Sequence, residues 1–266
     1  MENPWIAASS ALFLWWFSTG LILWRVRVAD NAGHDAHVWS CLLSLPLFAL
    51  GVIGVHATLG DTSANGAFLG FVSALAIWGW IELAFLSGLI TGPNRRPCPA
   101  TASGQDRFLR AFGTIAWHEM TLVVTLLVLA MMAQGAANPF GLWTFAVLFF
   151  ARVSAKLNLF FGVPRINTEF LPRPLTHLAS HFRRGPITAF FPLSISLLTF
   201  ASYCWLERLW QAGTPGQIIG FTLLSALTLL ALLEHWFMVL PLPDQKLWRW
   251  MMPAPKTITP AAATKD

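Results

Sequence analysis

Seven stretches of the chain are long enough and apolar enough to cross a membrane as helices. A transmembrane helix needs about 20 predominantly apolar residues, and seven such stretches follow one another with polar segments between them. They cover residues 4–24, 38–59, 66–91, 108–133, 139–161, 188–206 and 217–240. Pro241 and Pro243 end the last stretch. The pattern predicts an all-α, polytopic membrane protein with one seven-helix domain over residues 1–252 and a disordered tail over residues 253–266.

The composition supports this class. Of the 266 residues, 56% are hydrophobic and 11% are charged, whereas about 25% charged residues is usual for a soluble domain. A chain of this composition cannot give a folded domain a polar surface in water. Its 14 tryptophans suit a protein that meets the membrane interface. The net charge of +5 does not require a nucleic-acid partner, because basic loops that face the cytoplasm explain it.

The basic residues fall almost entirely on one side of the predicted membrane. Of the 17 Lys and Arg residues, 16 lie in or beside the segments that follow the first, third, fifth and seventh stretches. Only Arg208 lies on the other side. Because basic residues accumulate on the cytoplasmic side of membrane proteins, we expect the N-terminus in the periplasm and the C-terminus in the cytoplasm.

The cytoplasmic segment after the fifth stretch is expected to be ordered. A short interfacial helix over residues 174–184 would begin at Pro174, which is a favourable first helical position. Its polar face would carry His177 and His181, four residues apart. Glu169 precedes it in the same loop. These three side chains are the polar candidates of the loop.

Ionisable residues lie at similar depth in four of the predicted helices. At about 1.5 Å per residue, they all fall in the cytoplasmic half of the membrane. Charged groups inside an apolar span are costly, so they are functional candidates. The predicted polar layer, a candidate ligand pocket, consists of Glu82, His118, Glu119, Arg152, Lys156, Asn158, Glu234 and His235.

Three interpretations of this layer stay open. The first is a network of buried ion pairs that holds the helices in register, because unpaired buried charge is expensive. The second is a ligand pocket for an anionic or pigment-like molecule. The third is a di-iron-like metal site, because paired Glu and His from several helices build such sites. The metal ligands would then come from His118, Glu119, His177, His181, Glu234 and His235. Neighbouring residues on a helix point about 100° apart, which counts against the metal site.

Five stretches resemble one known family. They are FLWWFSTGLILWR from Phe13, SALAIWGWIELAFLSGLITGPNRRPCP from Ser73, RFLRAFGTIAWHEM from Arg107, the run from Phe140 to Arg184, and LLEHWFMVLPLPDQKLWRWM from Leu232. Together they resemble the PuhE family, photosynthetic complex assembly protein 2 of anoxygenic phototrophic bacteria. The resemblance covers nearly the whole chain, and the run from Ala151 to His181 is the most specific part of it.

The resemblance implies a pathway rather than a mechanism. It implies a bacterial inner-membrane protein that helps to build the photosynthetic reaction centre and its light-harvesting antenna, or that controls their supply of bacteriochlorophyll. The implied partners are subunits of these complexes, other assembly factors and membrane lipid, and the implied ligand is bacteriochlorophyll or a precursor. The family brings no catalytic residues. A metal-dependent oxidoreductase of pigment metabolism and a transporter are the alternatives; no internal repeat or pair of broken helices supports the transporter.

Overall fold

The computed structural model describes residues 3–168 and 171–241, and all of its long elements are α-helices. In chain order they are α1 (Pro4–Ala32), α2 (His34–Thr58), α3 (Ala64–Leu86), α4 (Gly104–Met132), α5 (Phe140–Phe161), α6 (Phe190–Trp210) and α7 (Pro215–Phe237). All seven are long and apolar enough to cross a membrane, which confirms the predicted all-α polytopic fold. The predicted tail over residues 253–266 and Glu169 lie outside the described residues.

Local sequence explains where the helices begin and end. Ser63, Ser103 and Thr214 cap α3, α4 and α7, because each side chain accepts a hydrogen bond from a backbone N–H of the first turn. A single residue, Gly33, joins α1 to α2 with a φ of 105°, a backbone conformation that favours glycine.

Two predicted boundaries were wrong by five or more residues. The first helix continues to Ala32 rather than ending at residue 24, because its last two turns are polar but contain no helix breaker. The third ends at Leu86 rather than at residue 91, because Gly88 takes a φ of 77°. The N–H groups of Leu89 and Ile90 then turn back to the carbonyl of Ala84. Apolar sequence alone does not reveal either change.

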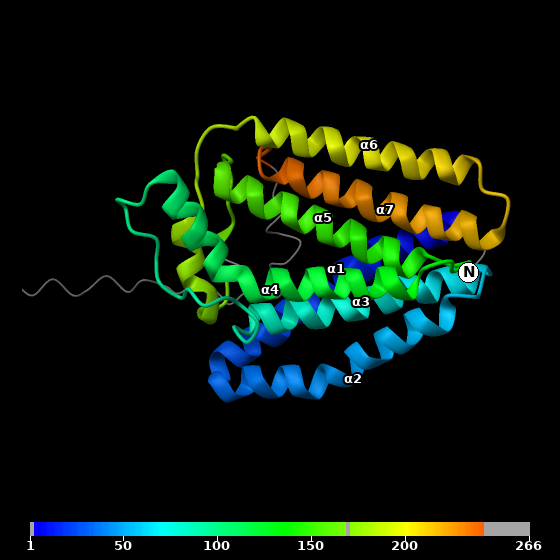
Figure 1. The fold of residues 1–266 in the computed structure, drawn as a ribbon, viewed down its shortest axis with the longest axis horizontal. Helices are drawn as coiled ribbons and strands as arrows, with labels where there is room; N and C mark the ends of the chain where they lie inside the picture. The colour runs from blue at the N-terminus through cyan, green and yellow to red at the C-terminus, as the bar shows by residue number, and fades with distance from the viewer. Residues whose placement is uncertain (1–2, 169–170, 242–266) are drawn as a thin grey trace, which may run out of the picture.

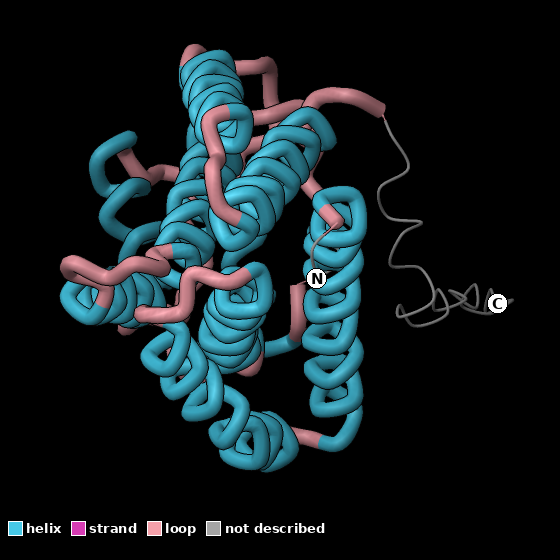
Figure 2. The backbone as a smooth tube through the Cα atoms, turned by 90° about the vertical axis from the view of Figure 1, so that its right-hand side faces the viewer, coloured by secondary structure: helices cyan, strands magenta, loops and turns pink. Residues whose placement is uncertain are grey.

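Apart from α1, the helices run roughly parallel to one another, with α3, α5 and α7 inside the bundle and α2 and α6 at opposite edges (Figure 1). The view along the bundle shows α1 standing apart on one side (Figure 2). In Figure 1, α1 crosses behind the bundle obliquely, from α7 at one end toward α2 at the other. Its N-terminal half packs on α7, where Ala7 and Ala11 share one buried cluster with Ile219 and Leu223.

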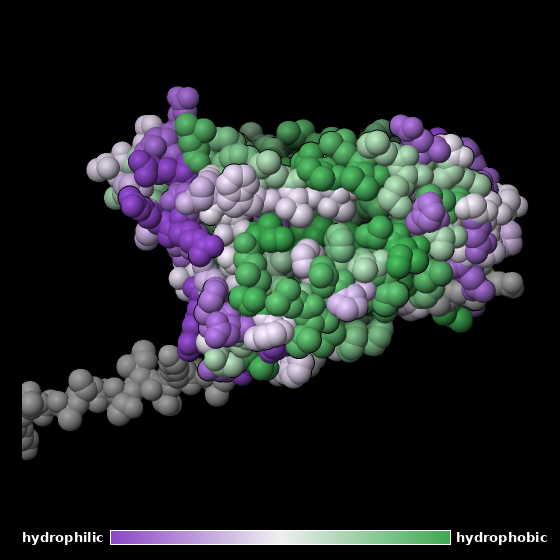
Figure 3. All heavy atoms as spheres, turned by 60° about the horizontal axis from the view of Figure 1, so that its bottom comes forward, coloured by the Kyte–Doolittle hydropathy of each residue, from purple (hydrophilic) through white to green (hydrophobic). Residues whose placement is uncertain are grey.

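An apolar belt surrounds the bundle. Large apolar side chains are exposed on its outer faces, among them Leu43, Phe150 and Phe200. Figure 3 shows this belt between two polar ends. The chain is therefore a multi-pass membrane protein. We call the end that carries the segments after α1, α3, α5 and α7 the basic end, and the opposite end the far end.

The segment between α5 and α6 folds against the basic end. It contains η2 (Arg173–His181), a 3-10 helix, where the sequence predicts a short helix over residues 174–184. A 3-10 helix has about 3.0 residues per turn, so residues three apart share a face. His181 therefore joins Leu175 and Leu178 on the buried face. The prediction that His177 and His181 share a polar face was wrong.

Candidate functional site

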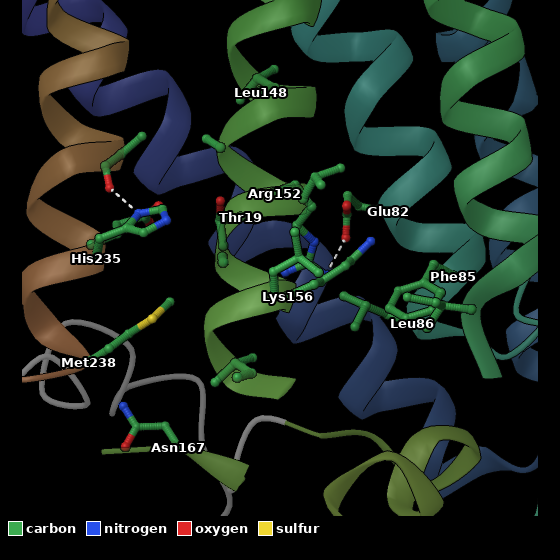
Figure 4. A pocket seen from close by; sticks show the side chains of 18 of the residues that line it. Thr19, Glu82, Phe85, Leu86, Leu148, Arg152, Lys156, Asn167, His235 and Met238 are labelled. Atoms are coloured by element: carbon green, nitrogen blue, oxygen red, sulfur yellow. Dashed lines mark hydrogen bonds and ion pairs between the residues drawn. The ribbon is translucent and has the colours of Figure 1, made fainter. Parts of the chain in front are cut away.

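Arg152 and Glu82 connect α5 to α3 in the basic half of the bundle. The Nη2 group of Arg152 donates a hydrogen bond of 3.0 Å to Oε2 of Glu82. Side-chain exposure is 35% for Arg152 and 11% for Glu82. The pair is drawn at the centre of Figure 4. Because one partner is largely buried, each group reduces the cost of burying the other.

Lys156 lies one helical turn further along α5 and binds a different helix. Its Nζ group donates a hydrogen bond to Oε1 of Glu119 on α4. The ring of Phe85 lies below both cations, with its centroid 5.5 Å from Nζ of Lys156 and 6.0 Å from Cζ of Arg152. One face of α5 thus holds two carboxylates from two neighbouring helices.

His118 lies behind this pair and is completely buried. Its ring is 4.3 Å from that of Phe85, measured between centroids. Nε2 lies 3.6 Å from Oε1 of Glu82, which is longer than a hydrogen bond. Neither ring nitrogen of His118 has a hydrogen-bond partner among the described residues. Its backbone N–H donates to the carbonyl of Thr91, which fixes the loop after α3 against α4.

His235 and Asn158 tie α5 to its other neighbours. The Nδ1 group of His235 lies 2.8 Å from the carbonyl of Ala231, so Nδ1 carries the proton and Nε2 accepts a 2.9 Å hydrogen bond from the hydroxyl of Ser154. The amide of Asn158 donates a 2.9 Å hydrogen bond to Oγ of Ser194 on α6. Asn158 is completely buried and connects two helices.

A cavity of about 770 Å³ opens beside these pairs. Its walls come from α1, α3, α4, α5, α7 and the segment after α5, and they are mostly apolar. Figure 4 shows labelled wall residues from several of these helices around the cavity, among them Thr19, Leu148 and Met238. The volume is in the range of small-molecule and cofactor sites, about 300–1,000 Å³.

Most of the predicted polar residues line this one cavity. They are Glu82, Glu119, Arg152, Lys156, Glu234, His235 and, at its basic end, His181. His118, Asn158 and His177 are not among its lining residues. Glu234 differs from the other two carboxylates of the wall: it accepts no hydrogen bond from a described residue, and Arg152 is its charged neighbour.

The structure does not bring the six metal-ligand candidates together. Glu119 is engaged by Lys156, and His235 by Ser154 and Ala231. His181 lies near the carbonyl of Arg96. In the part of the chain that the structure describes, no group of three or more His, Cys, Asp or Glu side chains could hold a metal ion. The geometry therefore favours ion pairing around a ligand cavity over a di-iron-like centre.

Two sets of contacts at the basic end were not evident from the sequence. Nη2 of Arg107 donates to the carbonyls of Phe160 and His181, at 2.7 and 2.8 Å, and its guanidinium stacks on the Phe160 ring. Asp30 accepts hydrogen bonds from the backbone N–H of Arg173 and lies 3.1 Å from His37. In the sequence, Arg107 is one of many basic residues in the loops. Its position next to an apolar stretch is the signal that could have marked it as a contact residue.

Comparison with known proteins places the chain in a family. Residues 1–259 match the family described as "Protein of unknown function (DUF3623)". The chain belongs to this family. It is 59% identical over 254 residues to the "Uncharacterized 30.4 kDa protein in puhA 5'region" of Rhodobacter capsulatus, a match that covers 96% of this chain and 93% of the relative. No solved structure matches.

Proposed function

We propose that this protein is an inner-membrane assembly factor of the photosynthetic reaction centre and light-harvesting antenna, and that its cavity holds bacteriochlorophyll or a precursor. The observation that carries the proposal is the relative named for its position in the 5' region of puhA, in a phototroph. A match over 96% of this chain at 59% identity supports a shared role.

The cavity supports the ligand part of the proposal. Its walls carry apolar and aromatic side chains such as Trp15 and Trp78 together with a few polar groups, as sites for lipid-soluble molecules do. It lies within helices that span the membrane, so a ligand dissolved in the membrane can reach it without entering water.

The alternative, a metal-dependent oxidoreductase of pigment metabolism, has less support. It needs Glu and His side chains that converge on one centre, and the described carboxylates Glu82 and Glu119 are bound to cations instead. A cavity in which two of the carboxylates are already bound to cations is better suited to holding a molecule than to supplying metal ligands.

Deleting the puhA-region gene in Rhodobacter capsulatus and complementing with this chain tests the assembly role. The proposal expects the deletion to lower reaction-centre and antenna absorption several-fold while respiratory growth is unchanged, and this chain to restore the absorption. The variant Lys156→Met, which removes a cation from the cavity wall, should restore less than the matched variant Arg208→Met at the exposed far end. Normal absorption in the deletion strain under all light and oxygen conditions would refute the proposal.

A further inference from the structure

Four charged groups of the cavity wall form two ion pairs. Arg152 binds Glu82 and Lys156 binds Glu119, so these four groups compensate one another. Glu234 projects from α7 into the same cavity without a hydrogen-bond donor among the described residues. The remaining polar lining at the basic end comes from Arg165, Asn167 and His181.

An acid in this position needs a partner. A carboxyl group that loses water without gaining a hydrogen bond is costly, and more so when it is charged. The neighbouring cation, Arg152, already donates to Glu82. A ligand that brings a hydrogen-bond donor or a positive charge would satisfy Glu234. A ligand that brings an anion would add a second negative charge beside it.

The walls also indicate how a ligand lies. The apolar residues Trp15, Leu75 and Leu227 line the cavity on its side toward the middle of the bundle. Leu227 precedes Glu234 by seven residues, or about 10 Å along α7. An apolar body would lie among these residues with its polar group at Glu234. The hydroxyl of Thr19 lines the same region from α1 (Figure 4).

The path of α1 indicates an access route from the membrane to the cavity, between α1 and α7. Helix α1 packs on α7 near the far end and diverges from α7 toward the basic end (Figures 1 and 2). In these two helices, most of the cavity wall comes from the diverging parts, residues 18–23 of α1 and residues 230–237 of α7. A molecule in the membrane leaflet at the basic end already has its polar group toward that end, which is the orientation that the cavity requires.

We propose that the cavity takes an amphiphile whose polar group donates hydrogen bonds or carries positive charge, and that the Glu234 carboxyl binds this group. This rests on the proposed function in that the cavity holds a ligand. In a bacteriochlorophyll, the group that meets the requirement would be the magnesium ion, because the keto and ester oxygens of the pigment only accept hydrogen bonds. Glu234 is then the specificity-determining residue of the site, and Arg152 and Lys156 hold the other two carboxylates away from the ligand.

The head-group preference can be tested on the full-length protein in lipid nanodiscs. The probes are three molecules with the same 18-carbon alkyl length and different head groups: octadecylamine, octadecanol and stearate. Native mass spectrometry should show one amine or alcohol bound per chain, with stearate at least tenfold weaker. Glu234→Gln should weaken the amine at least tenfold and change the alcohol less than threefold. Glu207→Gln, at the far end, should change none of them. Tighter binding of stearate than of the amine, or an amine affinity unchanged in Glu234→Gln, would overturn the proposal.

A second measurement tests the proposal even if the Glu234→Gln protein does not accumulate. Ala231→Cys places a thiol in the cavity wall one turn from Glu234. Octadecylamine should slow alkylation of this thiol by N-ethylmaleimide, and stearate should not; equal protection by both would contradict the proposal. These binding results stand apart from the deletion phenotype, so each proposal can fail without the other.

Discussion

The guanidinium of Arg152 on α5 donates a 3.0 Å hydrogen bond to the Glu82 carboxylate on α3, in the basic half of the membrane bundle. This pair joins two of the inner helices beside the cavity. It stabilises the fold in a way that neither residue can achieve alone, because each compensates for the buried charge of the other.

Replacing Arg152 with Met should leave Glu82 without its cation. The loss expected is about 1–3 kcal/mol, less than for a fully buried pair because the guanidinium is about one-third exposed. Thermal unfolding followed by size-exclusion chromatography should show a lower midpoint for Arg152→Met and no change for the exposed Arg208→Met. Adding Glu82→Gln should recover part of the loss; a double variant less stable than both single variants would contradict the pairing.

Asn158 should contribute to stability rather than to ligand binding. It lies outside the cavity lining and donates to Ser194 of α6. Asn158→Ala should cost about 1–3 kcal/mol, because it removes the two hydrogen bonds that the buried amide donates to Ser194 and to the carbonyl of Ser154. The same thermal measurement on Asn31→Ala, at an exposed position, is the control. An Asn158→Ala protein with the unfolding midpoint of the parent would show that this hydrogen bond is unimportant.

The packing of η2 should weaken in acid. Burial lowers the pKa of His181, and nearby Arg107 and Arg110 act in the same direction. Burial, His181 and Arg95 likewise lower the pKa of His177. Because the unfolded segment binds protons more readily, the contribution is complete above the unfolded pKa of about 6.5 and is lost as pH falls toward the lower folded pKa values.

Hydrogen exchange of the η2 amides measures this effect. After correction for intrinsic rates, protection should be lower at pH 5.5 than at pH 7.5. The double variant His177→Asn, His181→Gln should remove most of the difference. A pH dependence that survives in the double variant would mean that other groups are responsible.

The topology remains a prediction from the distribution of basic residues. A reporter enzyme that is active only in the periplasm should be inactive when fused after Asp266. The same reporter fused after Gln211, in the segment between α6 and α7, should be active. The reverse pattern would place the basic end in the periplasm, against the usual cytoplasmic preference of Lys and Arg.

The sequence was sufficient for the number of helices because membrane thickness sets the length of an apolar span. It also indicated that Glu82, Glu119, Arg152, Lys156 and Glu234 lie at similar depth, and all five line one cavity. The sequence could not show which of these charged residues pair with one another, because depth does not give the rotation of a helix about its axis. Lipid and protein interior are both apolar, so the pattern does not separate an inward face from an outward one.

Local geometry accounts for the other differences. The spacing of His177 and His181 suggests a shared face only at 3.6 residues per turn, and η2 has a tighter period. Asn158 looked like a member of the ligand site because it follows Arg152 and Lys156 on α5. Its actual partner, Ser194, is 36 residues away in the chain and carries no charge that would mark it.

The central claim is that the cavity holds a pigment, and a gentle purification from a phototrophic host tests it most directly. The absorption spectrum and the metal content should be measured on the same sample, for the parent, for Thr19→Trp, which fills the cavity from α1, and for Leu21→Trp on the exposed face of the same helix. We predict tetrapyrrole absorption in the parent and in Leu21→Trp, with magnesium in proportion to the pigment, and loss of both in Thr19→Trp. Absorption of equal intensity in all three proteins, or a colourless parent that carries stoichiometric iron, would contradict the account.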